Sequence, residues 1–278
     1  EEVIERLVNA FNGCEKLQRH MHFLLKKGSL YKVYNGNLLY HGCVPLEEDG
    51  SFSKVEVYGT QYQGRELYAT LEKYVRKAFF AVDEEERQKG RDILWYIWSG
   101  SSSPLYGKHK MATFERCFLA EDEPKVEYKN AYYKFLENEE VLDRILDESQ
   151  VKGNDRHIIN GHVPVHHMSG ESPAKCNGKL LIIDGGFSKA YQKETGIAGY
   201  TLINKSWGLV LAAHEPFTST EDAITQERDI LSNSMVVTRV KNRQSVGDTD
   251  AGEQMRERIA ELQELLKAYR SGLLVEKL

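Results

Sequence analysis

Two histidines and one aspartate stand where short apolar runs of the sequence end beside a glycine. His162 belongs to the run 158–164, Asp184 ends a run of leucines and isoleucines, and His41 ends the run 37–42. Short apolar runs that stop at a glycine are typical of buried strands whose ends open onto a site. Such an end holds a polar side chain rigidly, and glycine lets backbone and ligand approach closely. The pattern predicts a metal site built around two imidazoles.

An imidazole is a good ligand for manganese, iron or zinc ions, but two histidines alone make a poor site. A dinuclear catalytic centre also needs carboxylates, which neutralise and bridge the two cations. Asp184 could supply a catalytic carboxylate, or it could orient a histidine ligand from outside the coordination sphere. Taken singly, His41 or His162 could be a structural histidine, but their matching strand-end positions together favour metal binding.

Other histidines occur in patterns that do not fit a metal site. The D-x-H sequence Asp155-Arg156-His157 precedes its predicted strand, so its side chains would fall at the wrong edge of the sheet. His20 and His22 lie two positions apart in a predicted helix, and residues at that spacing do not share a helix face. We interpret the first pattern as coincidence and the second as solvated or capping histidines.

Length and composition describe an ordinary globular chain. Of the 278 residues, 41% are hydrophobic and 28% are charged. The net charge of −5 gives no reason to expect a nucleic acid or an acidic membrane surface as partner. No apolar stretch reaches membrane-spanning length, and the first residues do not resemble a signal peptide.

Two further features concern the chain's context. The four cysteines are widely separated and form no C-x-x-C pair, which predicts reduced thiols in a cytoplasmic protein. The sequence starts without Met, in the middle of a helical pattern and with no N-cap residue. We therefore expect it to be a piece of something longer.

Hydrophobic periodicity divides the chain into four segments, each dominated by one kind of element. The segments are 1–63 (a helix, then strands with the first His-Gly motif), 64–150 (helices), 151–245 (strands) and 246–278 (a C-terminal helix). Within them, we expect helical structure over 1–27, 64–98 and 111–150, the last with a charged interruption at 121–125. We also expect a helix over 137–148 with Val141, Leu142, Ile145 and Leu146 packed inward, a hairpin at 200–212 and a helix over 219–232. A strand over 235–241 and an amphipathic helix over 253–270 follow.

Basic side chains are candidates for binding the phosphates of a substrate, because phosphate needs cationic or backbone donors. The candidates are Lys108, Lys110, Arg116, Lys175 and Lys189. Lys189 is the first choice because it follows a Gly-Gly turn by three residues. Each of the five could equally be an ordinary surface residue. The loop 99–108, rich in glycine and hydroxyl groups, would suit a phosphate or serve as an interhelix linker.

Several segments in combination resemble the class III fructose-1,6-bisphosphatases of Firmicutes and Bacteroidetes-type bacteria, which are similar to calcineurin-like metallophosphatases. The likeness extends from about Leu17 to the C-terminus, and together its motifs are specific. The segments are 41–45, 103–108, 110–116, 160–165, 181–191, 195–202 and 214–217.

This resemblance implies a gluconeogenic enzyme that hydrolyses the C1 phosphate of fructose 1,6-bisphosphate at a dinuclear manganese centre. His41 fits the superfamily's strand–His-Gly place and His162 its Gly-His place, so both would bind the same metal ion. The implied mechanism is direct attack on phosphorus by a metal-activated hydroxide, while both metals hold phosphate oxygens.

The chain also departs from the superfamily pattern. The D-x-H, G-D-x-x-D-R-G and G-N-H-D/E motifs, which hold the other ligands, do not occur in a suitable context. We therefore expect an α/β or α+β fold that forms the C-terminal half of a metallophosphatase-type β-sandwich, flanked by helices, with the helical insertion 64–150 across the site. We expect this chain alone to bind metal weakly or not at all and to have negligible phosphatase activity.

Two alternatives stay open. The chain could be a regulatory or assembly module of such an enzyme, in which the helices of 64–150 and 253–270 form the subunit contacts of a homo-oligomer. Apolar helix faces more often belong to a core than to an interface, so this alternative ranks second. The other is a phosphomonoesterase with a different substrate.

Overall fold

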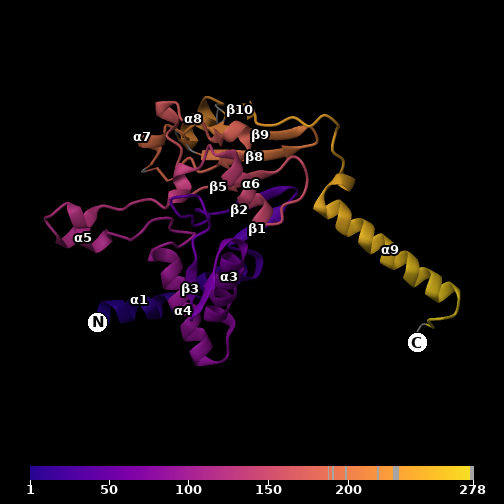
Figure 1. Cartoon of the computed structure of the whole chain (residues 1–278), viewed down its shortest axis with the longest axis horizontal. Coiled ribbons are helices and arrows are strands. Elements are labelled where there is room, and N and C mark those ends of the chain that lie inside the picture. Colours follow the sequence, from indigo (N-terminus) through magenta and orange to yellow (C-terminus); the bar gives the residue numbers. More distant parts are fainter. Residues whose placement is uncertain (187, 190, 198, 218, 228–231, 276–278) are drawn as a thin grey trace. The chain divides into compact units, whose positions relative to one another are not determined.

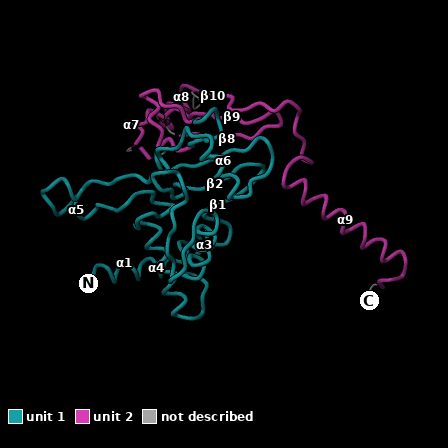
Figure 2. Tube along the Cα trace, in the orientation of Figure 1, with its two compact units in different colours: residues 1–163, 175–182 teal, residues 164–174, 183–278 magenta. Residues whose placement is uncertain are grey.

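The computed structural model describes residues 1–186, 188–189, 191–197, 199–217, 219–227 and 232–275 (Figure 1). The chain forms two compact units (Figure 2). Unit 1 comprises Glu1–Val163 and Lys175–Ile182, and unit 2 comprises Pro164–Ala174 and Ile183–Leu278. The fold is a mixture of helices and sheets, as expected, whereas the four segment boundaries drawn from periodicity stay a prediction.

Unit 1 begins with two amphipathic helices, α1 (Glu2–Gly13) and α2 (Glu15–Lys27). This confirms the helical pattern predicted for the first 27 residues. The chain leaves α2 at Gly28, directly after two lysines that complement the negative end of the helix dipole. Neither helix contains a buried residue, so their apolar faces are exposed.

A five-stranded sheet carries the two histidine motifs. Its order is β1-β2-β5-β7-β6. The strands are β1 (Tyr31–Tyr34), β2 (Asn37–Tyr40), β5 (His157–Asn160), β6 (Ala174–Lys175) and β7 (Leu180–Ile182). The β1–β2 hairpin is antiparallel, but β2 pairs with β5 and β5 pairs with β7 in parallel. The carboxyl ends of β2 and β5 therefore meet at one edge of the sheet, as is common for ligand sites in open parallel sheets.

Buried side chains of the sheet pack against α6 (Glu139–Glu148). This helix buries the four apolar residues predicted for its inner face, which are Val141, Leu142, Ile145 and Leu146. Asn138 caps its first turn by accepting a hydrogen bond from the Val141 amide at 3.1 Å. The resulting core makes the sheet a rigid support for whatever its strand ends carry.

A second cluster forms between the hairpin β3 (Val55–Val57)–β4 (Thr60–Tyr62) and the helices α3 (Gly64–Phe80) and α4 (Glu84–Ser99). Its buried members from α3 and α4 are Leu67, Leu71, Val75, Ile93 and Ile97. The two helices are those predicted within 64–98. They lead into the loop 100–107, which returns the chain to the sheet.

The helical structure predicted over 111–150 holds only in part. Between Gly107 and Asn130 the chain forms an arm, with α5 (Thr113–Phe118) and the 3-10 turn η1 (Glu123–Lys125) (Figure 1). An isolated antiparallel β-bridge between the backbones of Lys108 and Lys129 joins the two sides of the arm. Beside it, the His109 amide donates to the Tyr128 carbonyl oxygen at 3.0 Å. Another 3-10 turn, η2 (Ala131–Lys134), connects the arm to the segment before α6. A run of acidic residues with Pro124 disfavours a continuous helix here.

Unit 2 contains the three-stranded antiparallel sheet β10-β9-β8. Strands β8 (Gly199–Lys205) and β9 (Gly208–His214) confirm the predicted hairpin, and β10 (Ser232–Val236) begins earlier than the predicted strand. Of the helix predicted over 219–232, the structure has α8 (Thr220–Thr225), and residues 228–231 of that prediction lie outside the described residues.

The remaining elements of the chain are short turns and one long helix. They are η3 (His167–Ser169), η4 (Cys176–Gly178), α7 (Gln192–Thr195), η5 (Val246–Asp248) and α9 (Asp250–Arg270). Helix α9 confirms the amphipathic helix predicted at the end of the chain. Among the described residues, none of the helices combines the length and apolarity that crossing a membrane requires.

Candidate metal centre

The two predicted histidines lie side by side. His41 follows β2 directly, and His162 follows β5 by two residues. His41 Nε2 and His162 Nδ1 are 3.1 Å apart, and the ring centroids are 4.9 Å apart at an interplanar angle of 66°. The Gly161 amide donates to the His41 carbonyl oxygen at 2.9 Å, which ties the two strand ends together. The parallel pairing of β2 with β5 produces this arrangement.

The spacing of the two nitrogens suits a shared metal ion. Histidine nitrogens bind such ions at about 2.0–2.1 Å, so two on one ion lie roughly 3.0–3.4 Å apart, depending on geometry. His162 Nε2 donates to the Tyr106 carbonyl oxygen at 2.9 Å. Because a carbonyl can only accept, the proton sits on Nε2 and Nδ1 keeps its lone pair for His41 or a metal ion.

His162 has an unusual backbone conformation, with φ at +66°. Residues other than glycine rarely enter this left-handed region, and strain of this kind clusters at functional sites. The conformation lets the chain turn at the end of β5 while the ring stays directed at His41. The sequence predicted the strand end but not this strain.

Gly42 allows the loop 100–107 to pack directly on the first strand end. A Cβ atom at this position would lie 2.5 Å from the Pro104 carbonyl oxygen and 2.7 Å from that of Leu105. The Cys43 amide donates to the same Pro104 oxygen at 2.9 Å. The loop therefore positions the histidines through its backbone, a role that neither the phosphate nor the linker interpretation included.

Asn160, missed as a functional candidate, lies beneath the pair at the end of β5 and is 3% exposed. Its Nδ2 donates to the Gly42 carbonyl oxygen and to the Tyr132 hydroxyl, both at 3.0 Å. Its Oδ1 is buried and has no hydrogen-bond partner among the described residues. An orphaned acceptor of this kind suits a bound water or cation. The sequence signal was a single amide that follows two isoleucines at the end of β5.

Three of the five basic candidates help to hold the arm together. Lys108 and Arg116 pair with Glu127 at 2.6 Å and 3.4 Å, and Lys110 Nζ donates to the Pro124 carbonyl oxygen at 2.6 Å. Burial would raise the pKa of Glu127, but hydrogen bonds from Lys108, the Ala112 amide and the Tyr106 hydroxyl outweigh it and lower this pKa to about 2. The sequence did not single out Glu127.

Tyr106 links this ion-pair network to the histidines. Its hydroxyl donates to Glu127, and its carbonyl oxygen accepts from His162. Burial, followed by the charge of Glu127, raises the pKa of Tyr106 to about 12, so the hydroxyl stays a donor over the physiological range. The base of the arm and the imidazole pair are therefore parts of one connected structure.

The remaining candidates are divided between the units. Lys175 lies half-buried on β6, at the edge of the sheet. Asp184 and Lys189 belong to unit 2, whereas the histidine pair belongs to unit 1. The Asp184 side chain is half-buried and accepts a hydrogen bond from the Gly186 amide at 2.9 Å, and Lys189 is exposed. The catalytic and phosphate-binding roles of these three residues stay predictions.

The described part of the chain contains no group of three or more His, Cys, Asp or Glu side chains placed to hold a metal ion. A metal ion at the histidine pair would therefore need further ligands.

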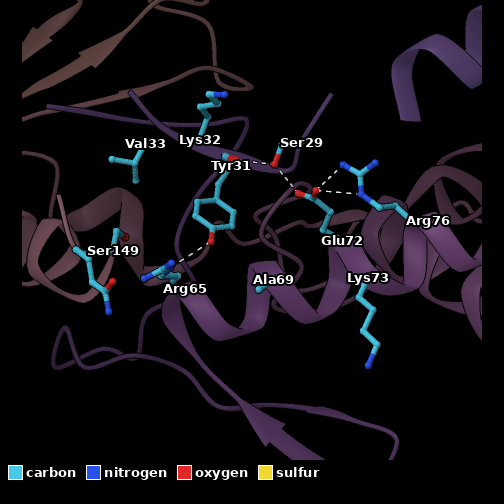
Figure 3. Close-up of a pocket in the computed structure, with 11 residues that line it drawn as sticks. Ser29, Tyr31, Lys32, Val33, Arg65, Ala69, Glu72, Lys73, Arg76 and Ser149 are labelled. Carbon is cyan, nitrogen blue, oxygen red and sulfur yellow. Dashed lines mark hydrogen bonds and ion pairs between the residues drawn. The ribbon is translucent and has the colours of Figure 1, made fainter. Parts of the chain in front are cut away.

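A groove of unit 1 is a different feature, with a volume of about 730 Å³ and neither histidine in its lining (Figure 3). Glu72 pairs with Arg76 at 2.6 Å and accepts from the Ser29 hydroxyl at 2.5 Å, so this pair ties the start of β1 to α3. Figure 3 shows Lys32 and Lys73 directed away from each other. Their charges do not converge, and we assign no ligand to the groove.

Comparison with known proteins identifies clear relatives. Residues 1–271 match a family described as Firmicute fructose-1,6-bisphosphatase. The chain is 52% identical over 275 residues to fructose-1,6-bisphosphatase class 3 of Clostridioides difficile (strain 630), covering 99% of this chain and 42% of that protein. It is 48% identical over 278 residues to the protein of the same name from Clostridium novyi (strain NT), covering 100% of this chain and 42% of the relative.

The chain thus spans about two fifths of the length of the curated relatives that it matches. No solved structure matches it.

Proposed function

The chain belongs to the Firmicute fructose-1,6-bisphosphatase family, and we propose from this premise that it forms the histidine-bearing part of a metal-dependent sugar-bisphosphate phosphatase. The reaction would be hydrolysis of fructose 1,6-bisphosphate to fructose 6-phosphate and phosphate, a step of gluconeogenesis in the cytoplasm. The observation that carries the proposal is the 3.1 Å approach of His41 Nε2 to His162 Nδ1.

Three features of the site fit a divalent ion such as Mn²⁺. The two facing nitrogens have the separation expected of ligands on one ion. The Tyr106 carbonyl oxygen holds His162 in the tautomer whose Nδ1 carries no proton and can act as a ligand. The Asn160 amide oxygen is a buried acceptor without a partner among the described residues. When bound, such an ion supplies Lewis-acid polarisation of a phosphate oxygen and activates water at neutral pH.

The residues of this chain would act mainly by orienting. Gly42 and the loop 100–107 hold the first imidazole, and Tyr106 holds the second. Asp184 is the proposed catalytic carboxylate. Lys189 and Lys175 are the first candidates for the substrate phosphates. Lys108, Lys110 and Arg116 would first have to exchange their contacts in the arm.

We also propose that the centre is of the metallophosphatase type and contains two manganese ions. A second cation needs bridging carboxylates, and the described residues place no third His, Cys, Asp or Glu beside the pair. The family members are more than twice as long as this chain, so the missing carboxylates would come from the part of the family sequence that it does not span. The chain would then correspond to the C-terminal part of the enzyme.

Metal titration of the 278-residue chain tests the proposal. We expect weak Mn²⁺ binding, seen as loss of the free-ion signal in electron paramagnetic resonance, together with negligible hydrolysis of fructose 1,6-bisphosphate. His41→Ala or His162→Ala should each weaken binding by roughly tenfold or more. His20→Ala is the matched control, because His20 is exposed on α2 and should leave binding unchanged.

Two results would contradict the proposal. Equal Mn²⁺ binding by the parent chain and by both strand-end variants would place the metal elsewhere. Full manganese-dependent turnover by this chain alone would show that no further ligands are needed, and it would refute the division of the centre between two parts of the family sequence.

An assembly module is the second candidate function, and the exposed apolar face of α1 favours it. Val3, Ile4 and Leu7 are each about two-thirds exposed on this face. A module of this kind would have no need of the imidazole pair. Unchanged metal binding in the histidine variants would therefore support it.

A further inference from the structure

The last helix, α9, carries an apolar seam of partly exposed side chains. Met255, Ile259, Leu262, Leu266 and Tyr269 follow one another at alternating spacings of four and three residues. Each remains about half exposed, between 47% and 57%. This is the a/d pattern of a coiled coil, with Ile259 and Leu266 at a positions and Met255, Leu262 and Tyr269 at d positions.

The charged side chains of α9 form ion pairs within the helix and do not cover the seam. Arg258 pairs with Glu261 at 2.7 Å and Lys267 pairs with Glu264 at 2.6 Å, both within the helix. The glutamates of these pairs lie at outer heptad positions. A helix with one apolar face, whose charged side chains elsewhere form ion pairs with each other, is typical of a helix that pairs with another helix.

The N-terminal end of the seam is already closed by the turn η5. Gly252 occupies the a position before Met255, and it is the one buried residue of this fully described helix. A Cβ atom at Gly252 would collide with the Val246 carbonyl oxygen, so η5 packs directly on the helix there. Arg256 donates to the Gly247 carbonyl oxygen and holds the turn in place.

We propose that α9 pairs in antiparallel orientation with α9 of a second copy of this chain. In the register that centres on Ile259–Leu262, Met255 faces Leu266 of the other copy and Ile259 faces Leu262 of the other copy. The pattern reads identically from both helices, as a two-fold axis requires. The a/d sequence of α9 therefore complements itself without any other partner.

The turn η5 favours the antiparallel orientation over the parallel one. In a parallel pair, both η5 turns would meet at the same end and hold the two Gly252 positions apart. In an antiparallel pair, each η5 lies at the opposite end, where it faces Tyr269 of the other copy. Val246 of η5 is 64% exposed and offers that tyrosine an apolar contact.

Charges across the proposed interface are compatible. In this register the flanking g positions place Arg258 beside Leu265 of the other copy, and the flanking e positions place Arg256 beside Gln263 of the other copy. No like charges meet, and the Arg258 stem can pack on the leucine. Because the exposed seam covers only about two heptads, we expect a dimer that dissociates on dilution rather than a permanent one.

Sedimentation equilibrium of the whole 278-residue chain tests the pairing. We expect a monomer–dimer equilibrium, and Leu262→Asp should raise its dissociation constant by roughly a hundredfold, because a charge is then buried in the central layer. Glu257→Ala, at an outer position of the same helix, is the matched control and should leave the constant unchanged. Circular dichroism of each variant checks that helix content is retained.

A charge exchange tests the orientation. Leu265→Lys alone should weaken the dimer, because the lysine faces Arg258 of the other copy. Adding Arg258→Glu should restore it, since the two new charges then attract across the antiparallel interface. Within one helix these positions are seven residues apart, about 10 Å, so an internal pair cannot explain the rescue.

Three outcomes would overturn the proposal. One is a chain that stays monomeric at every accessible concentration, which would mean that α9 is covered by unit 1 or by another protein. Another is a dimer that Leu262→Asp leaves intact. The third is weakening by Leu265→Lys that Arg258→Glu does not relieve, which would exclude the antiparallel register.

Discussion

His41 Nε2 and His162 Nδ1 face each other at 3.1 Å although the two residues are 121 positions apart in the sequence. The approach depends on the parallel pairing of β2 with β5, in which Leu39 lies beside Ile159. Parallel neighbours require a long crossover, and the chain uses it to build α3, α4, the arm and α6. The approach of the two histidines therefore depends on the folding of the whole of unit 1.

The first prediction concerns the left-handed backbone of His162. His162→Gly and His162→Ala both remove the ring and should both abolish its contribution to metal binding. The glycine variant should nevertheless be more stable than the alanine variant by about 1 kcal/mol, because only alanine keeps the backbone strain at φ +66°. Urea unfolding of the two variants measures the difference. Equal stabilities would show that the turn relaxes when the ring is absent.

The second prediction concerns the close approach of the loop to Gly42. Gly42→Ala should lower the free energy of unfolding by roughly 2 kcal/mol and weaken Mn²⁺ binding, because its Cβ meets two backbone oxygens that cannot swing aside. Gly13→Ala is the matched control, since a Cβ there meets nothing within 4 Å. A neutral result at Gly42 would mean that the loop does not position His41.

Much of this arrangement could be predicted from the sequence. A β-branched run that stops at a glycine has few structural meanings, and both strand ends are where the pattern placed them. The helices also followed their periodicity, as α6 shows by burying the four residues expected. These features are local, so the sequence around each residue contains the information.

The contacts around the arm could not be predicted in the same way. Glu127 lies between Val126 and Tyr128, and the sequence around it predicts an exposed loop. Its partners lie 11 to 21 residues away in the sequence, on the other side of the arm and at its base. The basic residues of 108–116 were interpreted as phosphate ligands because the carboxylate that neutralises two of them is not adjacent in the chain. Pairing of this kind depends on tertiary structure alone.

The third prediction concerns the role of Glu127 in the arm. Glu127→Gln should speed hydrogen exchange of the backbone amides between residues 108 and 129, because Lys108 and Arg116 lose their carboxylate. Hydrogen bonds to charged groups contribute about 1.5–3 kcal/mol each, so a loss of roughly 2 kcal/mol in local stability is expected. Glu121→Gln, an exposed change on the same arm, should have no effect.

The fourth prediction is the pH dependence of the same segment. The pKa of Glu127 is about 2 in the folded chain, against an ordinary value of 4.5 when the arm is open. A lowered folded pKa stabilises the folded state above the unfolded pKa, and this stabilisation is lost as the pH falls. Protection of the arm should thus decline between about pH 4.5 and pH 2, by about 3 kcal/mol in total. If protection in Glu127→Gln declined over this interval as much as it does in the unaltered chain, the pH dependence would belong to another group.

The last prediction concerns the thiol of Cys43, which lies directly beneath the first strand end. Burial raises the pKa of Cys43 to about 12, whereas Cys117 is exposed on α5. Because the thiolate is the reactive form, a thiol reagent at pH 8 should modify Cys117 quickly and Cys43 only when the core opens. Because Cys14 and Cys176 are half-buried and also react, Cys14→Ser, Cys117→Ser and Cys176→Ser should together remove the faster phases and leave the slow one unchanged.

The slow phase would then measure how often the histidine-bearing strand end opens. Gly42→Ala should accelerate it, because the alanine would push the loop 100–107 away and break the 2.9 Å hydrogen bond from the Cys43 amide to the Pro104 carbonyl oxygen. Mn²⁺ should retard it, since an ion held by His41 and His162 ties the two strand ends together. Rapid modification of Cys43 in the unaltered chain, located by mass spectrometry, would contradict the packing on which the metal centre depends.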